Sequence, residues 1–246
     1  MINTKKLYDI NSKKWVRNKP RSLSDFTGRP AMIKLCGNID EKKLLDIGCG
    51  EGYVARLLVK KNPKLIVGVD VSKKMIDLAN ENSKDKRLKF YTGNIKKLNF
   101  PDRSFDIVLG VFVFNYLSIN EMKKSMGEVF RVLKPSGKFI FSVPHPFLPF
   151  IKKDKKSSLE FNFNDMNYFS SRDKFAKGFI ECIDESRLPV KMNHKLIEDY
   201  FNVLKIAGFK SIPELHELKV KKKDMDKKFI KKNINLPLHL AFKISK

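Results

Sequence analysis

Between residues 43 and 143 the chain alternates between two patterns of apolar residues. Segments with apolar side chains at helical spacing lie near residues 52–61, 72–83 and 120–132, and Pro135 and Gly137 end the last of them. Short runs that are apolar at almost every position separate these segments: KLLDIG at 43–48, LIVGVD at 65–70, LKFYTG at 88–93, FDIVLGV at 105–111 and KFIFSVP at 138–144. Strands that are apolar on both faces are typical of a parallel sheet with helices on each side, so the pattern predicts a doubly wound α/β fold.

The segments on either side of this core follow other patterns. Residues 4–37 predict two short helices joined by the turn-rich segment NKPRSLSDFTGRP, and residues 144–190 lose the alternation and become an irregular, aromatic-rich stretch. We expect this stretch either to cover a substrate or to pack its aromatic side chains on the core. A helix at 194–207 closed by Gly208 and strands at 211–218 and 237–244 follow. These patterns predict one domain with four parts: a helical lid at 1–40, a core at 41–145, an insertion at 146–192 and a C-terminal unit at 193–246.

The charge of the chain is strongly positive but has an uneven composition. The net charge is +24 over 246 residues, yet 42 of the 51 basic residues are Lys and only 9 are Arg. Nucleic-acid surfaces more often combine Arg with aromatic residues. The densest basic run, at residues 219–232, is interrupted by acidic residues. The composition favours a solvated lysine-rich surface and leaves a nucleic-acid contact as the alternative.

The sequence contains no pattern of a membrane or secreted protein. No window approaches the roughly 18 consecutive apolar residues of a membrane span, and the first residues lack the apolar centre of a secretory signal. The three cysteines, Cys36, Cys49 and Cys182, have neither a metal-ligand spacing nor an even number for a disulfide framework. We therefore expect a cytoplasmic protein without a membrane partner or a metal site. The sequence does not determine its oligomeric state.

A turn with alternate glycines connects the first predicted strand to the first core helix. In LLDIGCGEGYVARLL, residues 44–58, Gly48, Gly50 and Gly52 allow a ligand to approach the backbone closely. The phosphate-binding loop of nucleoside triphosphatases requires a Lys and a Ser or Thr after its glycines, and the dinucleotide motif requires a different glycine spacing. Glu51 would also repel a pyrophosphate at the start of the helix. The turn therefore predicts a ligand without a pyrophosphate.

The acidic residues near this turn indicate what that ligand carries. Asp46 and Glu51 flank the glycines and would suit a positively charged or ammonium group. Asp70 ends the next predicted strand, twenty residues beyond Gly50, where an acid in nucleotide-binding α/β folds accepts hydrogen bonds from ribose hydroxyls. Together these residues predict a nucleoside with a cationic, amino-acid-like tail, which is the description of S-adenosylmethionine.

Four ordered motifs give the chain a family resemblance. They are LLDIGCGEG at 44–52, VGVDVSKKMIDLA at 67–79, YTGNIKKLNFPDRSFDIVL at 91–109 and EVFRVLKPSGKFIFSVP at 128–144. Over about a hundred residues the chain resembles class I S-adenosylmethionine-dependent methyltransferases of the small-molecule type. The resemblance implies a Rossmann-like, doubly wound sheet of seven mostly parallel strands with an antiparallel final strand.

The resemblance also implies roles for particular residues around S-adenosyl-L-methionine and its product S-adenosyl-L-homocysteine. It places Asp46 at the methionyl ammonium, Asp70 at the ribose, and Gly110 and Val111 beside the sulfonium and methyl. The chain departs from the family pattern at Asn94, where an acid commonly stands, although an Asn carbonyl oxygen can still accept a hydrogen bond from adenine. The remaining implied contacts are Gly48, Cys49 and Gly50 along the methionyl and ribose portions and Val71, Met75 and Ile95 around adenine.

The acceptor side is less clearly defined. His145, directly after the fifth core strand, is a candidate base or a structural loop histidine, and Arg29 is a candidate partner for the methionyl carboxylate. After the fourth strand the chain reads VLGVFVFNYL, which lacks the motif that resembles base- and amide-nitrogen methyltransferases. The leading hypothesis is therefore in-line methyl transfer to an oxygen or nitrogen of a small molecule. The alternatives are an RNA or protein methyltransferase that docks through the lysine-rich segment, and a non-catalytic cofactor-binding subunit.

Overall fold

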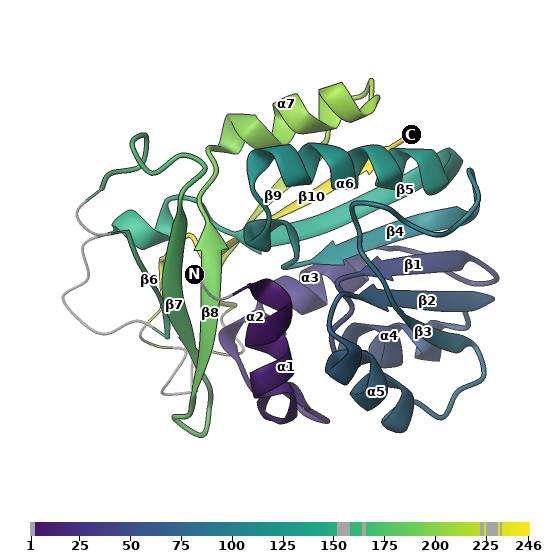
Figure 1. Ribbon diagram of the computed structural model, residues 1–246, viewed down its shortest axis with the longest axis horizontal. Helices are drawn as coiled ribbons and strands as arrows, with labels where there is room; N and C mark the ends of the chain where they lie inside the picture. The colour runs from purple at the N-terminus through teal and green to yellow at the C-terminus, as the bar shows by residue number, and fades with distance from the viewer. Residues whose placement is uncertain (1–2, 152–157, 164–165, 222–223, 225–230, 232) are drawn as a thin grey trace.

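The computed structural model contains one seven-stranded sheet with helices on both faces and a separate three-stranded sheet (Figure 1). It describes residues 3–151, 158–163, 166–221, 224, 231 and 233–246. The large sheet has the strand order β3-β2-β1-β4-β5-β10-β9, in which the last strand of the chain, β10, is antiparallel to both of its neighbours. Its strands are β1 (Lys43–Ile47), β2 (Leu65–Asp70), β3 (Leu88–Thr92), β4 (Phe105–Val111), β5 (Leu133–Pro144), β9 (Glu214–Leu218) and β10 (His239–Ser245). This arrangement confirms the predicted Rossmann-like sheet.

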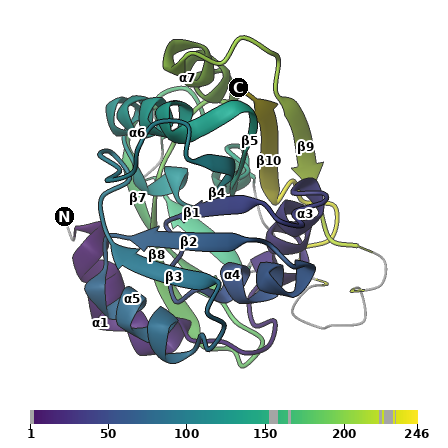
Figure 2. The ribbon, with the colours of Figure 1, turned by 90° about the vertical axis from the view of Figure 1, so that its right-hand side faces the viewer.

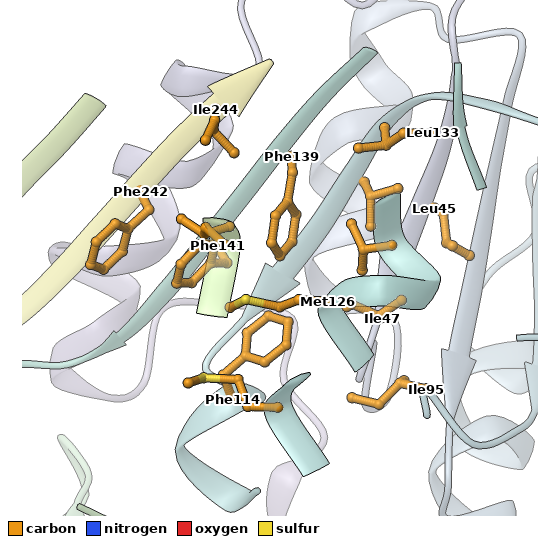
Figure 3. Close-up of a cluster of buried hydrophobic side chains, with 14 of the residues drawn as sticks. Leu45, Ile47, Ile95, Phe114, Met126, Leu133, Phe139, Phe141, Phe242 and Ile244 are labelled. Carbon is orange, nitrogen blue, oxygen red and sulfur yellow. The ribbon is translucent and has the colours of Figure 1, made fainter. Parts of the chain in front are cut away.

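Alternate residues of the apolar strands face opposite sides of the sheet, and this explains why the strands are apolar throughout. Leu45 packs in the cluster on one face, whereas the adjacent Leu44 packs in the cluster on the other. The helices α6 (Ile119–Val132) and α7 (Ile197–Ala207) cover the first face, and α3 (Gly28–Leu35), α4 (Tyr53–Leu58) and α5 (Lys73–Glu81) cover the second. Figure 3 shows the first cluster, where Phe139 and Phe141 of β5 lie between neighbouring strands and Phe114.

Local signals fix the ends of the core helices. Ser118 accepts a hydrogen bond from the backbone N–H of Glu121, whose carboxylate accepts one from the Ser118 N–H in return, so α6 begins with a capping box. Ser72 caps α5 through the N–H of Met75. Gly208 ends α7 with a φ of +110°, as its predicted C-terminal role requires.

The N-terminal segment forms three helices, not the two that the sequence predicts. After α1 (Thr4–Trp15), the turn-rich segment contains a short helix, α2 (Leu23–Phe26), directly before α3. The carboxylate of Asp25 makes this helix possible, because it accepts hydrogen bonds from the backbone N–H groups of Arg21 and Ser22 at the helix start. Figures 1 and 2 show α1 beside α5, and Ser72 joins the two by donating a hydrogen bond to Asp9 over 2.5 Å.

The prediction of an irregular region at residues 144–190 is wrong in one respect, because much of this region forms an antiparallel sheet. The strands are β6 (Leu159–Asn162), β7 (Phe175–Glu181) and β8 (Arg187–Asn193), in the order β6-β7-β8. Every second residue along β8 is buried, Leu188, Val190 and Met192, which gives a one-sided strand. The prediction missed this sheet because its short strands mix charged and apolar residues and lack the continuous apolar runs of the core. Figure 1 shows it beside α1 and α2, apart from the main sheet.

Candidate functional site

The glycine turn lies at the carboxyl end of β1, where β1, β2 and β4 end side by side. Gly48, Gly50 and Gly52 all have positive φ angles, of 70°, 56° and 79°. A Cβ at Gly48 would lie 2.6 Å from a methyl carbon of Val113, so the protein itself occupies that space. A Cβ at Gly50 would have no heavy atom of the described residues within 4 Å. The backbone at Gly50 is therefore the part of the turn that stays open to a ligand.

Asp70 is fixed directly beside this open backbone. Its Oδ2 accepts a hydrogen bond from the Gly50 N–H at 3.0 Å, and its Oδ1 accepts one from the Ser72 N–H at 2.9 Å. Burial raises the pKa of Asp70, and these hydrogen bonds oppose that rise. Because each carboxylate oxygen can accept more than one hydrogen bond, both remain able to bind a pair of ligand hydroxyls. This geometry fits the ribose role that the sequence predicts.

Asp46 is a buried carboxyl group that lacks a partner. Only 1% of the residue is exposed, and neither side-chain oxygen has a hydrogen-bond partner among the residues that the structure describes. Burial raises the pKa of Asp46 to about 7; the charge of Asp70 adds to this effect and Arg29 opposes it. A buried carboxyl group without partners is unfavourable, so an ammonium group brought by a ligand would satisfy it. The residues present therefore fit the methionyl ammonium of S-adenosylmethionine.

These residues form one wall of a cavity of about 500 Å³. Most of the residues that the sequence predicts for the cofactor meet there, although they come from five separate segments. The predicted residues that line it are Arg29, Asp46, Gly48, Cys49, Gly50, Asp70, Val71, Met75, Asn94, Ile95 and Val111. Among the described residues, no group of three or more His, Cys, Asp or Glu side chains is arranged to hold a metal ion.

The side of the cavity assigned to adenine combines an exposed and a buried apolar residue. Val71 is 38% exposed and Met75 only 1%, and both are in the cavity wall. The side-chain carbonyl oxygen of Asn94 already accepts a hydrogen bond from the backbone N–H of Lys96 at 3.0 Å. It keeps room for a second hydrogen bond, which is the contact predicted for the adenine amine.

Gly110 does not line the cavity, in contrast to the adjacent Val111. A Cβ on Gly110 would lie 2.8 Å from the ring of Phe114, which fills the space beside β4. The glycine therefore allows close packing of Phe114. The sequence could not separate these two uses of a small residue, because both require only the absence of a side chain.

Glu51 does not offer a free charge to a ligand, although the sequence suggested that it would. The residue is 2% exposed, and its carboxylate lies 2.5 Å from the guanidinium of Arg56 and 3.5 Å from that of Arg17. Arg56 belongs to the helix that follows the turn, whereas Arg17 comes from the N-terminal segment. Glu51 lines the cavity but is paired with these two arginines, whereas Asp46 has no ion-pair partner among the described residues.

Arg29 reaches the cavity from α3 and is held by α2. One of its guanidinium nitrogens donates hydrogen bonds to Asp25, at 2.9 Å, and to Ser24. The guanidinium also lies over the ring of Phe112, 5.6 Å from its centroid. Arg29 thus lies in the cavity wall, and its contact with a methionyl carboxylate stays a prediction.

His145 lies outside the cavity, and the structure does not bring it to the reacting groups. Its Nε2 is 3.3 Å from Glu217 of β9, and its Nδ1 accepts the backbone N–H of Phe147 at 3.1 Å. Burial lowers the pKa of His145, against the opposing effect of Glu217. The antiparallel strands β10 and β9 extend the sheet beyond β5, so the histidine turns toward them. The position of His145 directly after β5 correctly predicts that it lies at the carboxyl edge of the sheet, but it does not predict the direction of the side chain.

Other residues of the cavity wall were not predicted as site residues. Tyr8 of α1 donates a hydrogen bond to the hydroxyl of Tyr116 at 2.6 Å, which joins the N-terminal segment to the loop after β4. His239 begins β10, and Phe112 follows β4 with a φ of 55°, unusual for a residue with a side chain. Asn115 completes this group, and all five residues line the cavity. No local motif marks them, because segments remote in the sequence bring them together.

The insertion contributes an apolar part of the wall. Its lining residues are Leu159, Phe161, Phe175, Ile180, Val190 and Lys191. Of the other aromatic residues, Phe150, Phe163 and Tyr168 pack around the ring of His194, and Phe147 and Phe169 are at least half exposed. Phe179 lies under the guanidinium of Arg187. The insertion therefore lines the cavity with some side chains and packs others in a cluster of its own.

Comparison with known proteins identifies a methyltransferase domain in the chain. Residues 45–141 match the family described as Methyltransferase domain. A demethylmenaquinone methyltransferase of Thermotoga maritima is 35% identical over 47% of this chain and 49% of its own length. An uncharacterised protein of Haemophilus influenzae is 30% identical over 61% of this chain and 63% of its own length. The chain thus spans less than two thirds of these curated relatives.

A solved structure supports the fold independently. The crystal structure of an S-adenosylmethionine-dependent methyltransferase from Mesorhizobium loti has a TM-score of 0.68 with 19% identity, over 88% of this chain and 96% of that one. No helix in the described part of the chain is both long and apolar enough to cross a membrane. With the glycine turn, the two aspartates and the sheet order in place, residues 45–141 are a methyltransferase domain, and the chain has the fold of, and is similar to, class I S-adenosylmethionine-dependent methyltransferases.

Proposed function

We propose that this protein transfers a methyl group from S-adenosylmethionine to an oxygen or nitrogen atom of a small molecule. The observation that carries the proposal is the composition of the cavity beside the glycine turn. One end has the open backbone of Gly50 with Asp46 and Asp70, and the other has the apolar wall of the insertion. Its volume of about 500 Å³ falls in the range of roughly 300 to 1,000 Å³ of small-molecule sites.

The protein's contribution is mainly to bind and orient. S-adenosylmethionine, when bound, supplies a methyl group on an activated sulfonium leaving group. Asp70 would hold the ribose and Asp46 the methionyl ammonium, so both ends of the nucleoside are fixed at the carboxyl edge of β1 and β2. Orientation of reacting groups in this way can lower a barrier by about 7 to 11 kcal/mol. A methyltransferase therefore does not require a catalytic triad.

The acceptor end supports a small, largely apolar substrate. Phe161 and Phe175 line it, and Lys191 places its ammonium 4.7 Å from the centroid of the Phe175 ring. The demethylmenaquinone methyltransferase named among the relatives also has a small-molecule substrate in its name, which is consistent with this class. Lys191 would favour an acceptor with a neutral or anionic polar group over a cationic one.

The alternative of RNA or protein as acceptor rests on the lysine-rich segment at 219–232. Most of this segment lies outside the described residues; within it the structure describes 219–221, 224 and 231. The cavity wall that the insertion builds favours the small-molecule acceptor, because it encloses the acceptor end with apolar side chains.

A label-transfer experiment tests the proposal. The protein is incubated with S-adenosylmethionine carrying a labelled methyl group and, separately, with the small metabolites, total RNA and total protein of its source cells. We expect the label in a small metabolite and its loss with Asp70→Ala, as measured by mass spectrometry. Label only in RNA or protein would support that alternative. Binding of S-adenosylhomocysteine by calorimetry without any transfer would support a non-catalytic subunit.

A further inference from the structure

His239 stands at the corner of the cavity that lies farthest along the sheet from the glycine turn. It begins β10 and pairs with Pro144 at the end of β5, whereas the turn follows β1. The sheet order places β4 and β5 between these two strands. The residue is 3% exposed and belongs to the cavity wall. Along the sheet, His239 is therefore separated from the turn and from Asp46 by β4 and β5, on the side of the cavity that we assign to the acceptor.

The hydrogen bonds of Thr27 fix the tautomer of His239. The Thr27 hydroxyl donates its single hydrogen to the carbonyl oxygen of Leu23 at 3.0 Å. The same oxygen lies 3.0 Å from the Nδ1 of His239. Because a hydroxyl has only one hydrogen to donate, the second contact requires an N–H on Nδ1. The Nε2 of a neutral ring in this state carries a lone pair and can only accept a hydrogen bond.

The surroundings keep this ring neutral and in place. Burial lowers the pKa of His239 to about 3, and the neighbouring charges of Arg29 and His145 act in the same direction. The Phe112 ring packs edge-on against the His239 ring, with centroids 4.7 Å apart. The Phe112 ring also fills the space above Gly28, where a Cβ would lie 2.4 Å from it. The positive φ of Phe112 is the kind of backbone strain that accompanies a defined site.

No described residue gives Nε2 of His239 a hydrogen bond. Nε2 is not among the fully buried polar atoms that lack a partner, so it is accessible from the cavity, and a ligand in the cavity can donate a hydrogen bond to it. We propose that His239 is a specificity residue for the acceptor: its Nε2 receives a hydrogen bond from a hydroxyl or neutral N–H group of the small molecule and so positions that molecule. This inference rests on the proposed function. Arg29, close enough to act on the charge of His239, disfavours an ammonium group at the same place.

The first test requires no acceptor. Long-range ¹H–¹⁵N correlation spectra of the full chain bound to S-adenosylhomocysteine report the tautomer of each histidine, and the spectrum of His239→Gln assigns the signals. We expect His239 to carry its proton on Nδ1 and to show no titration between pH 5 and pH 8. A proton on Nε2, or an imidazolium in this pH range, would overturn the proposal.

The second test measures label transfer to the small-metabolite extract at limiting and saturating extract. His239→Leu should reduce the rate at limiting extract about tenfold or more and change it less at saturation, with the affinity for S-adenosylhomocysteine within twofold of the wild type. His239→Gln, whose carbonyl oxygen replaces the Nε2 acceptor, should recover part of the loss. The control variant is His216→Gln, a partly exposed histidine of β9 that does not line the cavity, and it should leave the rate unchanged.

The outcomes separate this inference from the function on which it rests. No label transfer by the wild type contradicts the proposed function and the role of His239 with it. Transfer by the wild type that His239→Leu leaves unchanged contradicts the role of His239 alone. A variant that weakens cofactor and acceptor equally, with no recovery by Gln, identifies His239 as a structural residue.

Discussion

The two ends of the cavity are built from different kinds of chain. At the cofactor end, the neighbouring parallel strands β1 and β2 and the turn after β1 supply Asp46, Asp70 and Gly50 within twenty-five residues of sequence. At the acceptor end, the wall joins the loop after β4, the insertion sheet and the start of β10. The first end depends on backbone geometry that a few residues determine. The second depends on contacts between segments that the fold alone brings together.

This difference predicts how each end responds to change. Polar groups at the cofactor end are tied to the backbone or left without partners, so a single substitution there acts on ligand affinity directly. Side chains at the acceptor end mostly contribute apolar surface. Substitutions there should alter acceptor selection while the cofactor still binds. If the division is correct, cofactor affinity and acceptor selection should respond separately to substitutions at the two ends.

The largest effect is expected from Asp70→Ala. The substitution removes both acceptors for the ribose and releases the N–H groups of Gly50 and Ser72. Hydrogen bonds to a charged group contribute about 1.5 to 3 kcal/mol each, so affinity for S-adenosylhomocysteine should fall about a hundredfold or more in calorimetry. The control is Asp77→Ala, an exposed residue of α5 paired with Lys73, which should bind normally. Near-normal binding by Asp70→Ala would remove the ribose assignment.

Asp46→Asn should have opposite effects on binding and stability. The folded pKa of about 7 lies above the ordinary value near 4, so the folded apo protein loses stability as the pH rises between these values. Asparagine abolishes this loss. We expect the free energy of unfolding of the apo protein to rise by about 4 kcal/mol at pH 8 and to change little at pH 4, while cofactor affinity falls about tenfold or more.

Asp106→Asn is the matched control for the direction of this stability change. The pKa of Asp106 is lowered, since hydrogen bonds from Lys134 and the Lys43 backbone outweigh its burial. Its replacement should therefore destabilise the protein at neutral pH, as urea unfolding at several pH values would show. A loss of stability at pH 8 in Asp46→Asn as well would contradict the unpaired, partly protonated state assigned to Asp46.

At the acceptor end, Phe175→Ala should separate the two ligands. The ring lines the cavity beneath the ammonium of Lys191, so its loss removes apolar contact with the acceptor. We expect methyl transfer at limiting acceptor to fall about five- to tenfold, in line with about 1 to 1.5 kcal/mol of lost apolar burial, and cofactor affinity to stay within twofold. Phe169→Ala, 75% exposed in the same insertion, should change neither. Equal losses in both ligands would show that the two ends are not independent.

The smallest effect is expected from Tyr8→Phe. It removes the hydrogen bond to Tyr116 that joins α1 to the loop after β4 but keeps the ring contact with Trp15. Stability in urea should fall by about 1 kcal/mol, and cofactor affinity by no more than about threefold. The half-exposed Tyr91 provides the control, since Tyr91→Phe should leave both unchanged. A large loss of cofactor affinity would instead assign α1 to the cofactor end.

The sequence by itself determined the core sheet and most of the cofactor end. Continuous apolar runs specify buried parallel strands, and the sheet order then brings their carboxyl ends, with Asp46 and Asp70, to one edge. The glycines, the strand-ending acids and the helix caps act through neighbours in the chain, so they can be recognised without the fold.

The tertiary structure alone decided which side chains at that edge face the cavity. His145 directly follows β5 and His239 begins the neighbouring strand β10, yet of these two only His239 lines the site. Gly110 and Val111 are adjacent, and the position of Phe114 determines that only the valine is accessible. Side-chain direction depends on what packs against it from distant segments, such as Thr27 on His239 and β9 on His145, and those contacts have no signature in local sequence.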